Sequence, residues 1–531
     1  MATRLRDVRQ SSQSSAAGLP GPFGVATWLV VFVVGALVLG LVFGLSLFPR
    51  LDAGQRVINH LKPAFVPARV AGDTPAINMV SAIVNTLDPI MTPQGGASTE
   101  VPNLVGFLST KNGLTDAQVV STLEANFPDL AHLLLALPLS SVTAELPGLE
   151  TYLATALHAT PAQVLAALQA NFPGLAQSIV NLPAVTSGWD NVPGTAGFTN
   201  FDGSPIQTVP QVRDYFAGEV VPLVADNQTN FGRLADWFPP VWSIPVLLLV
   251  IGIVVVLLAL VMIVRSWQGA VTASLAQAGW AVVTAVGVLV LVVVFAFQLS
   301  PRLSGGQRLV NGAKPLFTPA RVAGNQAGIN IISSAVDAFD PVVASNSVAA
   351  GEVLPLVTYV SDKTGIPGNQ LFLALQAKFP AVVNLLQAIP LSSVTAEIPQ
   401  LLSFLETTLH LTEAQLGTAL QTNFPALTQA LVYLPTVTND WNDVPGTAAL
   451  TRFNGSPVRS VPQIRDYFKD DVIPAVTSSR ADFHTLAYTD PALTVFAPLL
   501  TIIGVVVVLY GLVLLMLSRR FGRFVEKIGP T

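Results

Sequence analysis

The chain has 531 residues, 51% of them hydrophobic and only 11% charged, and a formal net charge of −5. A soluble domain carries about 25% charged residues, so this composition indicates a membrane protein. The acidic balance argues against a nucleic-acid partner, which would need clustered Lys and Arg. The absence of cysteine excludes disulfides, thiolate nucleophiles and cysteine-ligated metals.

Four segments are longer than the roughly 20 apolar residues that cross a hydrocarbon core, and they predict four membrane spans. The first is too long for a cleaved signal peptide. None of the four contains Asp, Glu, Lys, Arg or His, which argues against an ion-coupled transporter. The predicted order is cytoplasmic tail 1–24, span 25–48, extracytoplasmic helical domain 49–240, span 241–264, cytoplasmic turn 265–274, span 275–299, extracytoplasmic helical domain 300–494, span 495–517 and cytoplasmic tail 518–531.

The orientation follows from the basic residues that flank the spans. The two tails and the turn between the second and third spans carry eight basic and two acidic residues, whereas the two long loops carry 18 basic and 29 acidic residues. Because basic flanks stay on the cytoplasmic side, we expect a multi-pass plasma-membrane protein with both termini cytoplasmic and both long loops extracytoplasmic.

The two halves of the chain repeat each other at an offset of 252 residues. Residues 49–72 read PRLDAGQRVINHLKPAFVPARVAG, residues 301–324 read PRLSGGQRLVNGAKPLFTPARVAG, and 16 of these 24 positions are identical. Each half has an even number of spans, so both copies keep one orientation. The expected fold is therefore mainly α: a four-helix transmembrane bundle with two tandem-duplicated, mainly helical extracytoplasmic domains, related by a pseudo-twofold axis along the membrane normal.

A smaller repeat of 45 residues lies inside each long loop and gives four units in total. Apolar residues spaced by three and four predict helices. A Phe-Pro pair should break each unit into two helices, because proline removes a backbone donor and clashes with the preceding turn. Three units open with a capping box, whereas Pro367 replaces the capping threonine in the fourth. The breaks fall at Phe127, Phe172, Phe379 and Phe424.

Two sets of polar residues recur at the 252-residue offset. One is basic and follows the first and third spans, where guanidinium groups could bind anionic lipid headgroups. The alternative is that these side chains reach the membrane surface and form ion pairs with the recurring acidic residues. The basic set is Arg50, Arg56, Lys62, Arg69, Arg302, Arg308, Lys314 and Arg321. The second set, expected to be structural, is Glu145, Glu397, Trp189, Trp441, Arg213, Asp214, Arg465 and Asp466.

Chemistry-bearing motifs are scarce. The sequence has no Walker loop, dinucleotide fingerprint, nucleophile elbow or H-E-x-x-H pair, and the five histidines share no ligand spacing, so we expect no enzyme and no cofactor. The acidic run 439–443 could bind calcium, although turn-forming Asx residues explain it better. Asn227 to Thr229 formally match a glycosylation acceptor.

Within the spans, small residues predict close helix packing at Gly40, Gly44, Gly252, Ala281, Ala285, Gly504 and Gly511.

The duplicated span–ectodomain–span arrangement, with Ala/Val/Leu-rich composition and scarce lysine, resembles membrane proteins of the actinobacterial (mycobacterial-type) cell envelope. The resemblance implies a plasma membrane facing the cell wall and no activity. We expect a non-enzymatic scaffold or accessory subunit in envelope assembly or lipid trafficking, with membrane lipids and a membrane-protein partner. The alternative is a lipid carrier or transporter whose paired ectodomains enclose an apolar cavity of roughly 300 Å³ or more.

Overall fold

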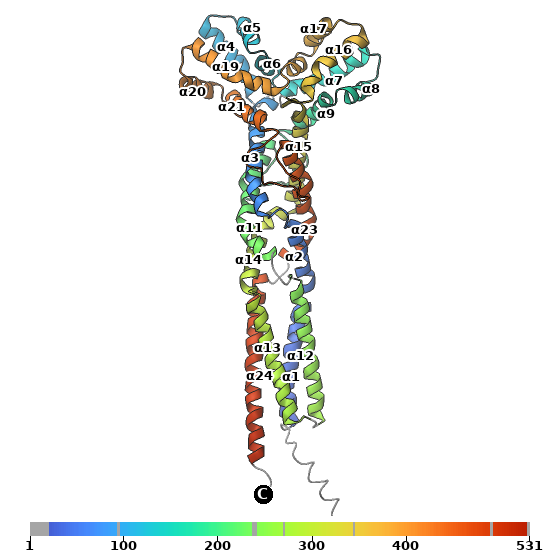
Figure 1. Ribbon diagram of the computed structural model, residues 1–531, viewed down its shortest axis with the longest axis vertical. Coiled ribbons are helices and arrows are strands. Elements are labelled where there is room, and N and C mark those ends of the chain that lie inside the picture. The colour runs from blue at the N-terminus through green and yellow to red at the C-terminus, as the bar shows by residue number, and fades with distance from the viewer. Residues whose placement is uncertain are drawn as a thin grey trace, which may run out of the picture. The chain divides into compact units, whose positions relative to one another are not determined.

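The computed structural model describes residues 21–92, 96–235, 240, 242–268, 271–343, 346–488 and 492–527. Within these ranges the regular structure is helical, and the only strand-like pairing is two isolated bridges, Thr199 with Pro205 and Thr451 with Pro457 (Figure 1). The predicted mainly α class is confirmed for this part of the chain. The predicted N-terminal tail up to residue 20, with its three arginines, lies outside the described residues.

The chain divides into two compact units. The first, here called the span unit, comprises residues 1–62, 227–314 and 478–531. The second, here called the shared unit, comprises a first segment, 63–226, and a second segment, 315–477. One compact unit therefore takes most of both predicted ectodomains.

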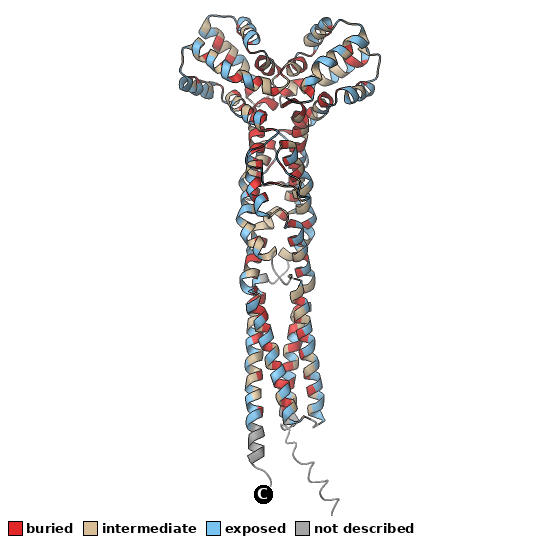
Figure 2. Ribbon diagram, viewed as in Figure 1, coloured by how far each residue is buried: buried red, intermediate tan, exposed pale blue. Residues whose placement is uncertain are grey.

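The span unit contains four helices long and apolar enough to cross a membrane, which makes the chain a membrane protein. They are α1 (Gly21–Gly44), α12 (Ser243–Trp267), α13 (Ala273–Ala296) and α24 (Phe496–Lys527). By length and composition alone, the described residues hold up to six spans if two bent helix pairs, Pro128–Ala136 with Leu139–Ala156 and Pro380–Gln387 with Leu391–Leu409, count as one span each. Apolar side chains of the four helices are widely exposed, as expected for surfaces that lipid covers (pale blue in Figure 2).

The spans pack in two pairs, α1 along α12 and α13 along α24 (Figure 1). Stacked indole rings of Trp28 and Trp280, with centroids 3.8 Å apart, join α1 to α13. The predicted close packing is found at Gly252, where an added Cβ would lie 2.6 Å from Leu39, and in the same way at Gly504 and Gly511.

The prediction for the G-x-x-x-G pair is wrong, since a Cβ on Gly40 or Gly44 would meet nothing within 4 Å. Gly35, five residues before Gly40 and so on a different face of the helix, instead faces α12, where its Cβ would lie 2.9 Å from Val255. Ala281 and Ala285 are exposed rather than packed. The spacing of small residues indicates that close packing is possible, but does not say which face of the helix meets its neighbour.

Two of the predicted spans end earlier than expected. α1 stops at Gly44, and Ser46, with φ of 49°, turns the chain into α2 (Leu47–Leu61). α13 stops at Ala296, and Gln298, also with φ of 49°, precedes α14 (Leu299–Ala313). A left-handed residue cannot continue a right-handed helix, which a hydrophobic run does not reveal.

The shared unit holds two similar series of helices. The first segment contains α3 (Pro67–Met91), α4 (Ala97–Asn112), α5 (Asp116–Asn126), α6 (Pro128–Ala136), α7 (Leu139–Ala156), α8 (Pro161–Asn171), α9 (Pro173–Gly188), α10 (Val209–Tyr215) and the π-helix η1 (Phe216–Val220), from which α11 (Val221–Ala235) continues. The second segment contains η2 (Lys314–Phe317), α15 (Pro319–Val343), η3 (Ala349–Gly351), α16 (Val353–Thr364), α17 (Gly368–Lys378), α18 (Pro380–Gln387), α19 (Leu391–Leu409), α20 (Glu413–Asn423), α21 (Pro425–Asp440), α22 (Val461–Asp466) and the π-helix η4 (Tyr467–Val472), from which α23 (Ile473–Ala487) continues.

Local sequence signals explain these boundaries. The three predicted capping boxes form, at Thr115, Thr160 and Thr412, and the Phe-Pro pairs separate α5 from α6, α8 from α9, α17 from α18 and α20 from α21. Each proline occupies the first position of the following helix, where its missing N–H costs nothing. The predicted division of each 45-residue unit into two helices is confirmed.

The core of the shared unit is built from both segments. α9 packs along α15 and α21 packs along α3, so the long contacts join helices from different segments. One cluster of buried side chains runs from Ala76 of α3 to Ile473 and includes residues of both series (red in Figure 2). The first and second segments therefore bury their apolar surfaces against each other.

Candidate functional site

The most regular polar contacts in the shared unit lie at the four Phe-Pro breaks. At the start of α18, the N-cap residue is Phe379, whose side chain cannot accept a hydrogen bond. The carboxylate of Glu145, from α7 of the other segment, accepts from the backbone N–H groups of Ala381 and Val382 at 3.3 and 3.0 Å. The negative charge also suits the positive end of the helix dipole.

The same contact occurs at the other three breaks. In every case a glutamate of one segment accepts from two consecutive N–H groups of the other segment, at distances of 2.8 to 3.4 Å. The glutamates and the N–H groups they bind are Glu397 with Asp129 and Leu130, Glu352 with Gly174 and Leu175, and Glu100 with Ala426 and Leu427.

An aromatic ring follows each glutamate seven residues later, on the helix that carries the glutamate or, for Glu352, on the helix that it N-caps. Tyr152 meets Phe379 edge to face, with centroids 5.9 Å apart, on the helix that carries Glu145. Such pairs contribute about 0.5–1.5 kcal/mol beyond the area they bury. The equivalent pairs are Phe107 with Phe424, Tyr359 with Phe172 and Phe404 with Phe127. We call each glutamate and aromatic pair, with the Phe-Pro break that it contacts, a clamp.

Glu145 and Glu397 belong to the set predicted to be structural, whereas Glu100 and Glu352 do not, although the same 252-residue offset relates them to each other. The missed signal is that Glu100 and Glu145 are separated by 45 residues, the period of the inner repeat, as are Phe107 and Tyr152. Comparing the two halves pairs Glu100 with Glu352, and comparing all four units shows that these two glutamates are equivalent to Glu145 and Glu397.

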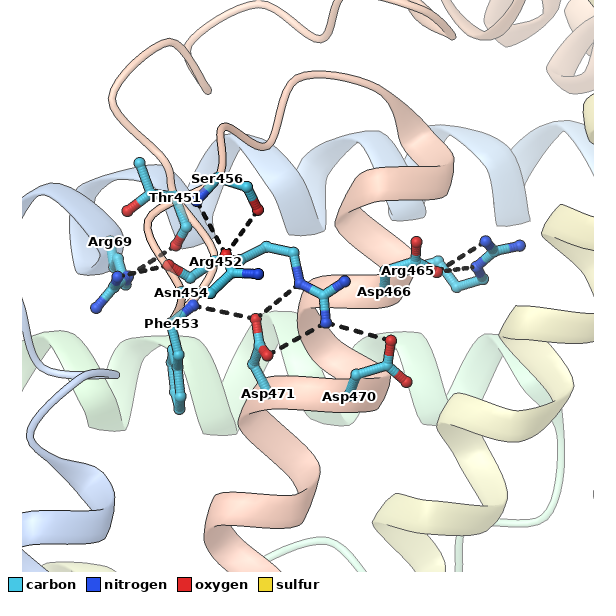
Figure 3. A network of polar contacts seen from close by, with 10 residues as sticks. All are labelled: Arg69, Thr451, Arg452, Phe453, Asn454, Ser456, Arg465, Asp466, Asp470 and Asp471. Carbon is cyan, nitrogen blue, oxygen red and sulfur yellow. Dashed lines mark hydrogen bonds and ion pairs between the residues drawn. The ribbon is translucent and has the colours of Figure 1, made fainter.

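Arg69 joins the start of α3 to a loop of the second segment. Its guanidinium donates to the carbonyl oxygens of Thr451, Arg452 and Pro63 at 2.6 to 2.7 Å, and lies over the ring of Phe453 (Figure 3). Arg321 does the same in the other direction, donating to the carbonyls of Thr199, Asn200 and Pro315 beside Phe201. Both guanidinium groups are therefore bound to protein.

The expected partners of these arginines are engaged elsewhere. Asp214 pairs with its neighbour Arg213, and Asp466 pairs with Arg465 at 2.7 Å (Figure 3). Glu145 and Glu397 cap helices. Arg69 and Arg321 therefore do not form the ion pairs predicted with these four acids. They donate to backbone carbonyl oxygens instead.

The other recurring residues fasten loops to the long helices. Trp189 donates its indole N–H to Asp88 at 2.9 Å, and Trp441 donates to Asp340 at 2.8 Å. In the second segment, Arg452 also pairs with Asp471 at 3.0 Å and with Asp470 at 3.2 Å (Figure 3). The first-segment equivalent of Arg452 is Asn200, so this ion pair is specific to the second segment.

The remaining basic residues belong to the span unit and differ in burial. Arg50 is only 2% exposed and lies over the ring of Phe496, and Arg302 is half-buried. Arg56 pairs with Asp482 at 2.7 Å and with Asp52. Further along, Lys62 donates to the Ala235 carbonyl at 3.4 Å, Lys314 lies 4.9 Å from the ring centre of Tyr488, and Arg308 is exposed.

Asp73 is the acid of the shared unit whose pKa departs most from its usual value. It is only 7% exposed on α3, and loss of water raises the pKa of its carboxyl to about 7, although Tyr467 and Arg69 nearby act to lower it. The equivalent residue of α15 is Asn325, which lies beside Tyr215. One segment therefore carries a titratable group where the other carries its neutral isostere.

Three cavities in the shared unit are small and apolar. Volumes of about 40, 40 and 50 Å³ are lined mainly by Ile, Leu, Val and Phe of both segments, with Arg465 beside one of them. Each of these volumes exceeds the roughly 10–15 Å³ that one water needs, but walls with so few polar groups favour an empty cavity. Among the described residues no group of three or more His, Asp and Glu is placed to hold a metal ion.

Comparison with known proteins gives no further assignment: no protein-family model, curated protein or solved structure matches the chain.

Replacing a clamp glutamate should destabilise the protein. Glu145→Ala and Glu397→Ala should each lower the free energy of unfolding by about 1–2 kcal/mol, because two N–H groups at a helix start lose their acceptor. Denaturant unfolding in detergent measures the change. The control is Glu124→Ala on α5, an exposed residue without a hydrogen bond in the described structure, which should change stability by less than about 0.5 kcal/mol. Equal effects of Glu145→Ala and Glu124→Ala would refute the capping role.

Asp73 should make stability depend on pH. Its pKa is higher in the folded than in the unfolded protein, so the folded state binds more protons, and stability falls as pH rises from about 4 to about 7, by roughly 4 kcal/mol in total. Asp73→Asn should flatten the melting temperature between pH 5 and 8 and raise it at pH 8. Asn325→Asp should introduce the same loss a second time. An unchanged pH profile in Asp73→Asn would contradict this assignment.

Proposed function

We propose that the chain is a non-enzymatic integral membrane scaffold or accessory subunit in cell-envelope assembly or lipid trafficking. In this proposal it lies in the plasma membrane, with both termini cytoplasmic and the shared unit extracytoplasmic. The observation that carries the proposal is the use of the polar side chains: the clamps, Arg69 and Arg321 all bind one segment to the other. These charged groups hold the shared unit together, and this use of charge fits a structural scaffold better than a catalyst.

We further propose that the chain arose by tandem duplication, with the two halves related by a pseudo-twofold axis along the membrane normal. The support is that contacts recur at an offset of 252 residues, as with Glu145 and Glu397 or Arg69 and Arg321. Each clamp contact and each arginine–loop contact made by the first segment on the second has a counterpart in the other direction, as expected if two identical ancestors had paired.

The alternative, a lipid carrier with an apolar cavity between the paired segments, has less support. Cavities of about 40–50 Å³ are far smaller than the roughly 300 Å³ or more of a ligand pocket, so a carrier would have to open its core. Opening would expose the buried side chains that both segments share, at a cost of about 25 cal/mol for each Å² of apolar surface.

The second segment offers a surface for a partner. Leu354 on α16 is 75% exposed and Leu373 on α17 is 65% exposed, and these two helices pack together. The equivalent positions in the first segment are Pro102 and Ser121. Because exposed large apolar side chains are typical of interaction surfaces and these two lie on neighbouring helices, we assign the partner-binding side to α16 and α17.

Site-specific photo-crosslinking in intact cells tests this role. A photoreactive residue at 354 or 373 should give a discrete adduct with a membrane-protein partner, whereas the same residue at 102 or 121, the matched positions of the first segment, should not. Adducts at neither pair would contradict the scaffold role. Accelerated transfer of a fluorescent phospholipid between vesicles by the purified protein would instead favour the carrier.

A further inference from the structure

The two short helices that follow the first and third spans have the same geometry. α2 begins after the left-handed Ser46 and α14 after the left-handed Gln298, both with φ of 49°. Each helix carries a glutamine that donates to an asparagine four residues later at 3.0 Å, Gln55 to Asn59 in α2 and Gln307 to Asn311 in α14.

Each of these helices also packs on a partner helix in the same way. A Cβ on Gly54 of α2 would lie 3.3 Å from Leu486 of α23, and a Cβ on Gly306 of α14 would lie 3.4 Å from Leu234 of α11. The backbone surroundings of α2 and α14 thus match closely, and the difference between them is in charge.

Arg56 of α2 is neutralised by two carboxylates. Asp482 of α23 and Asp52 of α2 both pair with it, and hydrogen bonding to Asp482 raises the pKa of its guanidinium above the usual value. The equivalent of Arg56 in α14 is Arg308, and the positions equivalent to the two acids hold Asn230 and Ser304. Arg308 is exposed and makes no ion pair or hydrogen bond with the described residues.

The residues around α14 and around α2 also differ in net charge. Residues 299–314 and 227–235, which form α14 and the adjoining part of α11, contain four Lys or Arg residues and no Asp or Glu. Residues 47–62 and 478–488, the corresponding parts of α2 and α23, contain four Lys or Arg residues and two Asp. The α14 side therefore has twice the net positive charge.

We propose that α14 binds the phosphate of an anionic lipid headgroup through Arg308, and that α2 has no such site. The inference rests on the proposed lipid partner and specifies where it binds. Only two residues separate the end of the span α13 from the start of α14, which favours a membrane lipid over free phosphate as the occupant. A guanidinium presents a planar fork of N–H groups that matches phosphate oxygens, and on α2 the carboxylates of Asp52 and Asp482 occupy that fork.

The test compares matched arginines in the full-length protein. Purified in detergent, the chain is titrated with phosphatidylglycerol or with phosphatidylcholine, and bound lipid is counted by native mass spectrometry. Arg308→Gln should weaken phosphatidylglycerol binding about fivefold, the value of one surface cation near anionic lipid, whereas Arg56→Gln should leave it unchanged. Neither change should affect phosphatidylcholine. Equal losses in both variants, or none in Arg308→Gln, would overturn the asymmetry.

Exchanging the acids provides a second, independent comparison. Asn230→Asp on α11 with Ser304→Asp on α14 places beside Arg308 the two carboxylates that Arg56 has, and should weaken phosphatidylglycerol binding as much as Arg308→Gln does. Asp482→Asn on α23 with Asp52→Ser on α2 frees Arg56 and should add a second binding event. Melting temperatures verify that each variant is folded. If the variants with exchanged acids do not fold, the comparison of Arg308→Gln with Arg56→Gln tests the proposal by itself.

Two results separate this inference from the proposed function. Binding of inorganic phosphate that is as sensitive to Arg308→Gln as lipid binding is would assign the site to free phosphate and overturn the lipid claim. Absence of any preference for phosphatidylglycerol would also overturn it. Neither result affects the scaffold role, because that role is tested by crosslinking at residues 354 and 373, which lie in the shared unit rather than on α14.

Discussion

The shared unit depends on the need to satisfy the N–H groups that each Phe-Pro break leaves open. Proline is well suited to the first position of a helix, but the side chain of phenylalanine at the N-cap offers no acceptor. The N–H groups of the two residues that follow the proline must therefore find an acceptor elsewhere. At all four breaks a glutamate of the other segment supplies it. A helix start that is incomplete within its own segment makes each segment dependent on its counterpart.

This dependence explains how the charged residues are used. The clamps tie α4, α7, α16 and α19 to helix starts in the opposite segment, and Arg69 and Arg321 tie the beginnings of α3 and α15 to opposite loops. Between these ties the long helices bury one continuous apolar core. Asp73, which is buried on α3 and takes part in no clamp, has a carboxyl pKa that burial raises to about 7.

Local sequence signals predicted much of this structure: four apolar helices, the capping boxes at Thr115, Thr160 and Thr412, and the Phe-Pro breaks. The sequence could not show that each glutamate caps a helix of the other segment rather than of its own. Glu100 and Glu352 are equivalent residues in the two halves, and either could have capped the helix that follows Phe172. Arg69 was predicted to bind headgroups or acids, but its actual partners are carbonyl oxygens, which carry no sequence signature. The packing glycine of α1 was misplaced because spacing alone does not orient a helix.

A double-mutant cycle tests most directly whether the clamps join the two segments. Tyr152→Leu and Phe379→Leu are measured alone and together by denaturant unfolding. Since these rings meet across segments, we predict a coupling of about 0.5–1.5 kcal/mol. Phe127 is the residue that Tyr152 would contact if the first segment folded on itself, and the cycle of Tyr152→Leu with Phe127→Leu should give less than about 0.5 kcal/mol. Coupling of Tyr152 to Phe127, with none to Phe379, would contradict the account.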